Sequence, residues 1–104
     1  MMDKIHQVAK LLMYDGPTAK ELIQKAVEKN EEFTITNTGN ITVLTIETTV
    51  AYGLKLTDVY SFNLEGQLIK QIIIMNGKEQ TVFDKYREAT QILTKLQRKK
   101  KKVS

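Results

Sequence analysis

The chain has 104 residues, of which 41% are hydrophobic and 27% charged, and this length and composition are typical of one domain with a single core. It has no cysteine, which excludes disulfides, thiolate metal sites and a cysteine nucleophile. Its net charge of +4 comes from five consecutive cations near the end, Arg98, Lys99, Lys100, Lys101 and Lys102. Without them, residues 1–97 carry eleven basic and twelve acidic groups, so we predict a nearly neutral domain over 1–97 and a basic tail over 98–104.

Two helices are predicted in the first 30 residues. The first has an apolar stripe at helical spacing and ends before the breaker Asp15-Gly16-Pro17. The second begins with Thr18 and Glu21 at the spacing of a capping box, in which each side chain bonds a free backbone N–H group. Neither helix has the continuous apolar stretch of a signal peptide or a membrane span, so we expect a cytoplasmic protein without a membrane partner.

From Phe33 the hydrophobic period changes from about 3.6 to 2, and Thr, Ile and Val become frequent. Four strands are predicted, over residues 33–37, 41–52, 54–64 and 68–76. The connections are short and rich in glycine, which favours an antiparallel meander. Residues 72–75 are apolar on both faces, so their strand is expected to be central or to be covered by a helix on its far side.

A long amphipathic helix is predicted after the last strand. Its main apolar residues are spaced by four and three: Val82, Tyr86, Ala89, Leu93 and Leu96. Phe83 and Ile92 widen this stripe, and the helix continues into the basic tail. We expect it to lie across one sheet face, against Ile46, Val50, Tyr60, Phe62, Ile72 and Ile74. The predicted fold class is therefore α+β, with two N-terminal helices, a four-stranded mainly antiparallel sheet and a C-terminal helix.

The basic tail has three interpretations. Cations at a helix C-terminus favour the macrodipole and keep the chain soluble. The residues Arg98, Lys99, Lys100, Lys101 and Lys102 could instead bind nucleic-acid phosphates, with salt-dependent affinity, or an anionic membrane surface. Because no aromatic residue in the run can stack on a base, the solvated helix end is the preferred interpretation.

Asp58 is the one candidate catalytic residue. It stands among apolar residues on the alternating set Leu54, Leu56, Asp58, Tyr60, Phe62 and Leu64. Burial there would raise the pKa of its carboxyl group, as a general acid or base at neutral pH requires, and Tyr52 and Tyr60 would be its polar neighbours in a pocket. In the alternative, a bulge near Gly53 or Thr57 turns Asp58 outward, or it only accepts hydrogen bonds.

No other chemistry is indicated by the sequence. His6 is the only histidine, and the chain has neither a phosphate-binding loop nor a dinucleotide-binding motif. We therefore expect no metal and no cofactor.

One stretch has a family likeness. YGLKLTDVYSFNLEGQLIKQIIIM, residues 52–75, resembles the closing hairpin of the ketosteroid-isomerase-like or SnoaL-like cone fold, the nuclear-transport-factor-2-like superfamily. The resemblance implies a curved antiparallel sheet wrapped around helices, with Asp58, Tyr60 and Phe62 directed toward a pocket or the helix packed there. The superfamily includes enzymes, transport factors and non-catalytic assembly domains, so it does not determine a function.

Three functions remain. The preferred one is a small non-catalytic binding or assembly module that forms a homodimer or binds a protein partner, since an uncovered apolar sheet face is expected to associate. The second is a nucleic-acid-associated accessory protein that uses the basic tail. The third is a small pocket enzyme or ligand binder of the SnoaL-like type, with Asp58 as acid or base.

Overall fold

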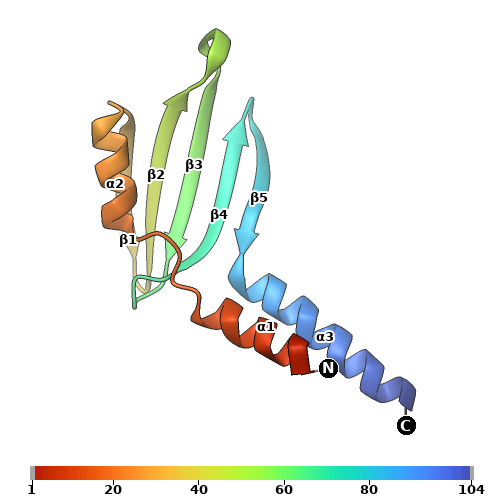
Figure 1. The fold of residues 1–104 in the computed structure, drawn as a ribbon. Helices are drawn as coiled ribbons and strands as arrows, with labels where there is room; N and C mark the ends of the chain where they lie inside the picture. The colour runs from red at the N-terminus through yellow and green to blue at the C-terminus, as the bar shows by residue number, and fades with distance from the viewer. Residues whose placement is uncertain (1, 104) are drawn as a thin grey trace.

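The structure, a computed structural model, describes the backbone of residues 2–103 and the side chains of residues 4–96. Two helices lead into five strands, and a long helix ends the chain (Figure 1): α1 (Met2–Met13), α2 (Ala19–Glu28), β1 (Glu32–Thr38), β2 (Ile41–Thr49), the short 3-10 turn η1 (Ala51–Gly53), β3 (Lys55–Phe62), β4 (Leu68–Met75), β5 (Lys78–Asp84) and α3 (Lys85–Val103). The sheet order β1-β2-β3-β4-β5 is antiparallel throughout. The α+β class and the meander are thus confirmed.

The sheet has a fifth strand that the sequence pattern did not reveal. Val82 and Phe83, expected to begin the C-terminal helix, lie in β5. Asn76 and Gly77 form its hairpin turn with φ of 53° and 73°, as a two-residue turn with both φ values positive requires. Val82 is the extra residue of a bulge, because Gln71 pairs with Phe83 and the next residue of β4 pairs with Thr81. This bulge breaks the alternation that would have identified the strand.

The core lies between α2 and one face of the sheet. Ala26 of α2 is buried against Leu44 and Ile46 of β2, together with Phe62 and Leu68. Ala19, Leu22, Ile23, Tyr60 and Phe83 pack around this cluster. The expectation that the C-terminal helix covers Ile46 and Phe62 is therefore wrong, since α2 occupies that position.

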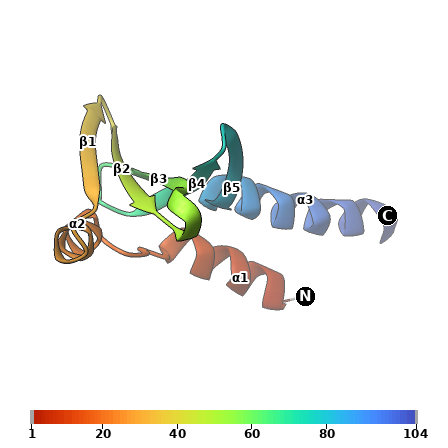
Figure 2. The ribbon, with the colours of Figure 1, turned by 90° about the horizontal axis from the view of Figure 1, so that it is seen from above.

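Helix α3 packs on α1 instead of crossing the sheet. The two helices run antiparallel, side by side, and extend beyond the end of the sheet (Figures 1 and 2). Val8 of α1 and Ala89 of α3 are buried. Because Lys85 follows Asp84 without a connecting loop, the helix continues past the end of β5 and does not fold back over a face.

The connection between α1 and α2 is held by contacts with distant parts of the chain. The Tyr14 carbonyl accepts a hydrogen bond from Nζ of Lys85 at 3.0 Å, and Lys85 is only 1% exposed. The Asp15 carbonyl accepts one from the backbone N–H of Leu68, also at 3.0 Å. Gly16 adopts φ +67°, and a Cβ there would lie 2.9 Å from Cβ of Leu68. The connection is thus tightly fitted at the start of β4 and α3.

The molecule is elongated. Its principal extents are 57 × 30 × 24 Å and its radius of gyration is 17.1 Å, whereas a compact domain of this length has about 13 Å. The projecting α1–α3 pair accounts for the long axis (Figure 2). Of the helices in the part of the chain that the structure describes, none combines the length and apolar character needed to cross a membrane.

Candidate functional site

Asp58 lies on the face of the sheet that carries the core. In β3 it pairs with Ile46 of β2 on one side and Ile73 of β4 on the other, and directly opposed residues share a face. Since Ile46 is buried against α2, Asp58 faces the same side and is half-buried. The bulge of this strand pair lies between Ser61 and Phe62, so it does not turn Asp58 outward.

Burial is the main influence on the acidic groups of this face. It raises the pKa of Asp58, a hydrogen bond from Nε2 of Gln71 (3.4 Å) opposes that rise, and the negative charge of Glu31 adds to it. Burial also raises the pKa of Tyr60, with further contributions from the charges of Asp58 and Glu31. The charge of Glu31 thus disfavours ionisation of Asp58, and the charges of both carboxylates disfavour ionisation of Tyr60.

Tyr52 does not belong to this group. The structure places it in η1, the turn between β2 and β3, with φ 63° and 99% exposure. β2 ends at Thr49, three residues earlier than the pattern indicated, and the left-handed conformation at Tyr52 directs the chain into β3. Of the three residues predicted to form a pocket, only Asp58 and Tyr60 lie together, two positions apart on one face.

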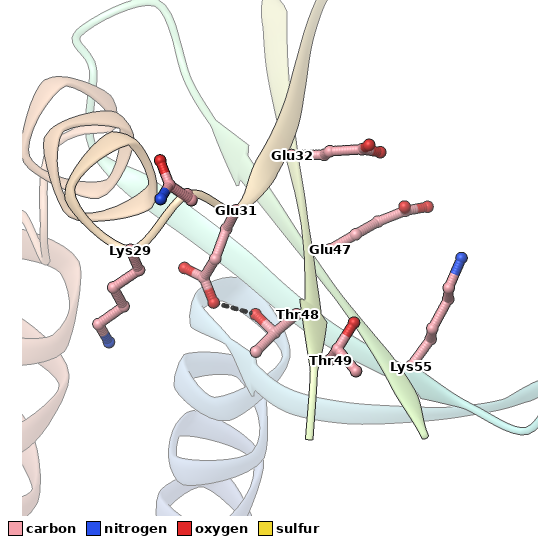
Figure 3. Close-up of a pocket in the computed structure, with 8 residues that line it drawn as sticks. Lys29, Glu31, Glu32, Glu47, Thr48, Thr49 and Lys55 are labelled. Atoms are coloured by element: carbon pink, nitrogen blue, oxygen red, sulfur yellow. Dashed lines mark hydrogen bonds between the residues drawn. The ribbon is translucent and has the colours of Figure 1, made fainter. Parts of the chain in front are cut away.

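A cleft that the sequence did not reveal lies where α2 ends and β1 begins. It has a volume of about 330 Å³ and is lined by Lys29, Asn30, Glu31, Glu32, Glu47, Thr48, Thr49 and Lys55 (Figure 3). Glu31 is fixed there by the hydroxyl of Thr48, which donates to its carboxylate at 2.5 Å. The two residues are seventeen positions apart, and the pattern around Glu31 indicated only the end of a helix.

The functional groups of this cleft do not converge on one point. Glu31 and Thr48 face the helix side, whereas Glu32 and Glu47 extend together away from them (Figure 3). Glu32 and Glu47 are opposed in the β1–β2 register, as is consistent with a shared outer face. The carboxylates and hydroxyl groups that line this cleft are therefore not directed toward one common point.

The described side chains provide no geometric evidence for a metal-binding site or a phosphate-binding site. Among the side chains that the structure describes, no three carboxylates or histidines are grouped closely enough to hold a metal ion. The tail residues Arg98 to Lys102 lie outside the described side chains, although the backbone of α3 is helical to Val103. Phosphate binding by the tail therefore stays a prediction.

Comparison with known proteins identifies no relative: no family model matches the chain, and neither a curated protein nor a solved structure matches it significantly. The resemblance of residues 52–75 to the SnoaL-like cone fold thus stays a prediction.

Proposed function

We propose that this chain is a small non-catalytic assembly module that associates with itself. The observation that carries the proposal is its surface area. The whole chain, its basic tail included, exposes 7925 Å², whereas a monomeric protein of 11.9 kDa is expected to expose about 5,900 Å². Stable homodimers bury roughly 1,000–2,500 Å² per chain, and the excess of about 2,000 Å² falls within that range.

The excess area coincides with a small core. Among the described side chains, seven apolar residues are buried: Val8, Ala26, Leu44, Ile46, Phe62, Leu68 and Ala89. Within residues 4–96, fifteen large apolar side chains are at least 39% exposed. Because burying one such side chain contributes about 1.5–3 kcal/mol, covering even a few of them would be comparable with the whole stability of a domain.

The non-catalytic part of the proposal rests on the two regions described above. Asp58 has a raised pKa, and the polar groups that influence it are the amide of Gln71 and the carboxylate of Glu31. The cleft beside Glu31 has groups that point to opposite sides of the sheet. Because neither region brings a set of catalytic groups to one point, we prefer a binding role to a catalytic one.

The test is the mass of the particle in solution. Light scattering on a size-exclusion column and sedimentation equilibrium should give about 24 kDa, twice the chain mass of 11.9 kDa. The dimer fraction should increase with concentration, as mass action requires. A mass of one chain up to millimolar concentration would contradict the proposal.

A further inference from the structure

We infer that the helix pair α1–α3 is the surface through which two copies of this chain associate, as the two halves of a four-helix bundle. The inference rests on the proposed self-association and specifies its interface. It follows from the observation that the apolar stripe of each helix is longer than the part of it that the single chain buries.

The stripe of α1 is only partly covered. Ile5, Val8 and Leu12 are spaced by three and four residues, which places them on one side of a helix, as in a coiled-coil seam. Val8 is 7% exposed where α1 meets α3, but Ile5 is 61% and Leu12 42% exposed. The contact with α3 therefore buries the middle of the stripe and leaves its two ends in water.

The stripe of α3 has the same property. Tyr86, Ala89, Leu93 and Leu96 are spaced by three, four and three residues. Ala89 is 5% exposed, whereas Tyr86 and Leu93, two turns apart, are 52% and 45% exposed. Each helix thus presents uncovered apolar residues one heptad apart, Ile5 with Leu12 and Tyr86 with Leu93.

The position of the pair prevents the same chain from covering it. α1 and α3 extend beyond the end of the sheet, and α2 lies at the other side, beside β1 (Figures 1 and 2). α1 has twelve residues and is about 18 Å long. Beyond the end of the sheet, α1 and α3 cover each other only along their shared seam, so the apolar residues outside that seam stay exposed.

A second copy fits this surface for reasons of area and symmetry. The excess of about 2,000 Å², taken over the whole chain with its basic tail, is within the range that an obligate dimer interface covers. A two-fold axis brings the same stripe of each copy together, so one apolar surface complements itself. Because each α3 has five consecutive cations in its last part, an antiparallel arrangement of the two α3 helices would place these charges at opposite ends and avoid their repulsion.

The competing surface is the free edge of β1. All seven residues of this strand are exposed, including Phe33 at 39% and Ile35 at 49%, and its outer edge is unpaired within the sheet. Pairing two such edges would join backbone groups and cover few apolar side chains, leaving the stripes of α1 and α3 in water. The β1 edge is therefore the comparison surface of the test.

The test introduces a charge on each surface of the full chain. Ile5→Glu and Leu93→Glu act on the helix stripes, Ile35→Glu acts on β1, and Leu64→Glu is a control in the β3–β4 turn, where Leu64 is 73% exposed. We expect the two helix variants to weaken dimerisation at least 100-fold and to sediment as single chains. The Ile35 and Leu64 variants should retain the wild-type mass.

Hydrogen exchange on the wild-type protein gives a second readout that needs no variant. On dilution, backbone protection should be lost in α1 and α3 and should stay unchanged in β1. If the helix variants remain dimeric while Ile35→Glu is monomeric, or if β1 loses protection on dilution, the inference is overturned and self-association stands. If the wild-type chain is monomeric at every concentration, both fail.

Discussion

Replacing Gly16 by alanine should destabilise the protein more than the backbone angle alone explains. Gly16 has φ +67°, in the left-handed region that side chains with a Cβ disfavour by about 1–2 kcal/mol. Part of that cost is offset because alanine restricts the unfolded chain, an effect worth about 0.4–1 kcal/mol. The backbone term alone is therefore about 1 kcal/mol.

The larger cost comes from the neighbours of the new methyl group. It would lie 2.9 Å from Cβ of Leu68 and 3.3 Å from Cε2 of Tyr14, whereas carbon atoms are normally about 3.5–4.0 Å apart. Leu68 is 3% exposed, and its N–H is bonded to the Asp15 carbonyl, so it cannot retreat without losing that bond. Overpacking of this kind costs about 1–3 kcal/mol, giving about 2–4 kcal/mol in total.

Gly39 provides a matched control. Its φ of +65° is nearly the same, but no atom lies within 4 Å of the position of a Cβ. Gly39→Ala should therefore cost only the backbone term of about 1 kcal/mol. Urea denaturation followed by circular dichroism, at one fixed chain concentration, gives both free energies of unfolding. Equal losses in the two variants would show that the α1–α2 connection is not fitted against Leu68.

Three further predictions concern single side chains. The folded state raises the pKa of Asp58, so the contribution of this group to stability is fully present below the ordinary pKa of an aspartate and is lost as the pH rises through the raised pKa. Asp58→Asn should therefore raise the unfolding temperature at pH 7 and reduce the decrease in unfolding temperature between pH 4 and 7. An unchanged pH profile of the unfolding temperature would contradict this. Lys85→Ala removes a buried side chain and its hydrogen bond to the carbonyl of Tyr14. Urea denaturation should show that the free energy of unfolding decreases by about 2–4 kcal/mol. The control Lys95→Ala, at an exposed position of the same helix, should decrease it by less than about 0.5 kcal/mol. Thr18→Ala removes the hydroxyl that accepts from the N–H of Glu21 at 3.1 Å, and the same measurement should show a loss of about 1 kcal/mol.

The first four strands were predictable because their alternation is local. Their starts differ from the predicted ones by at most one residue, and the short connections indicated the antiparallel order. β5 was hidden by the bulge at Val82, after which the apolar spacing imitates a helix. Asn76-Gly77 was the available signal, since this dipeptide is typical of a two-residue hairpin turn.

The placement of the helices was not predictable from the same pattern. An amphipathic stripe indicates that a helix buries one side, but it does not identify what covers that side. The stripes of α2 and α3 look equivalent in the sequence, yet Ala26 of α2 joins the core while Ala89 of α3 packs outside the sheet. The direct junction of Asp84 and Lys85 determines where α3 lies, and this junction cannot be inferred from a sequence pattern in which β5 is hidden.

In the candidate site, too, the features set by neighbouring residues could be predicted from the sequence, whereas those set by distant residues could not. The side of β3 on which Asp58 lies follows from alternation, because no bulge precedes it. The exposure of Tyr52 follows from a left-handed residue that ends β2 early, and tyrosine gives no local signal for that conformation. The hydrogen bond between Glu31 and Thr48 joins elements seventeen residues apart, which no periodicity encodes.

Composition and fold together support the proposed self-association. A hydrophobic content of 41% is ordinary for a domain with a full core, but the fold places two amphipathic helices beyond the sheet, where one chain cannot cover them. The unused apolar surface is therefore a property of the topology and not of an unusual sequence. Since the stripes of α1 and α3 keep their regular spacing where they are uncovered, at Leu12 and Leu93, we propose that a helix pair from a second copy of the chain covers them.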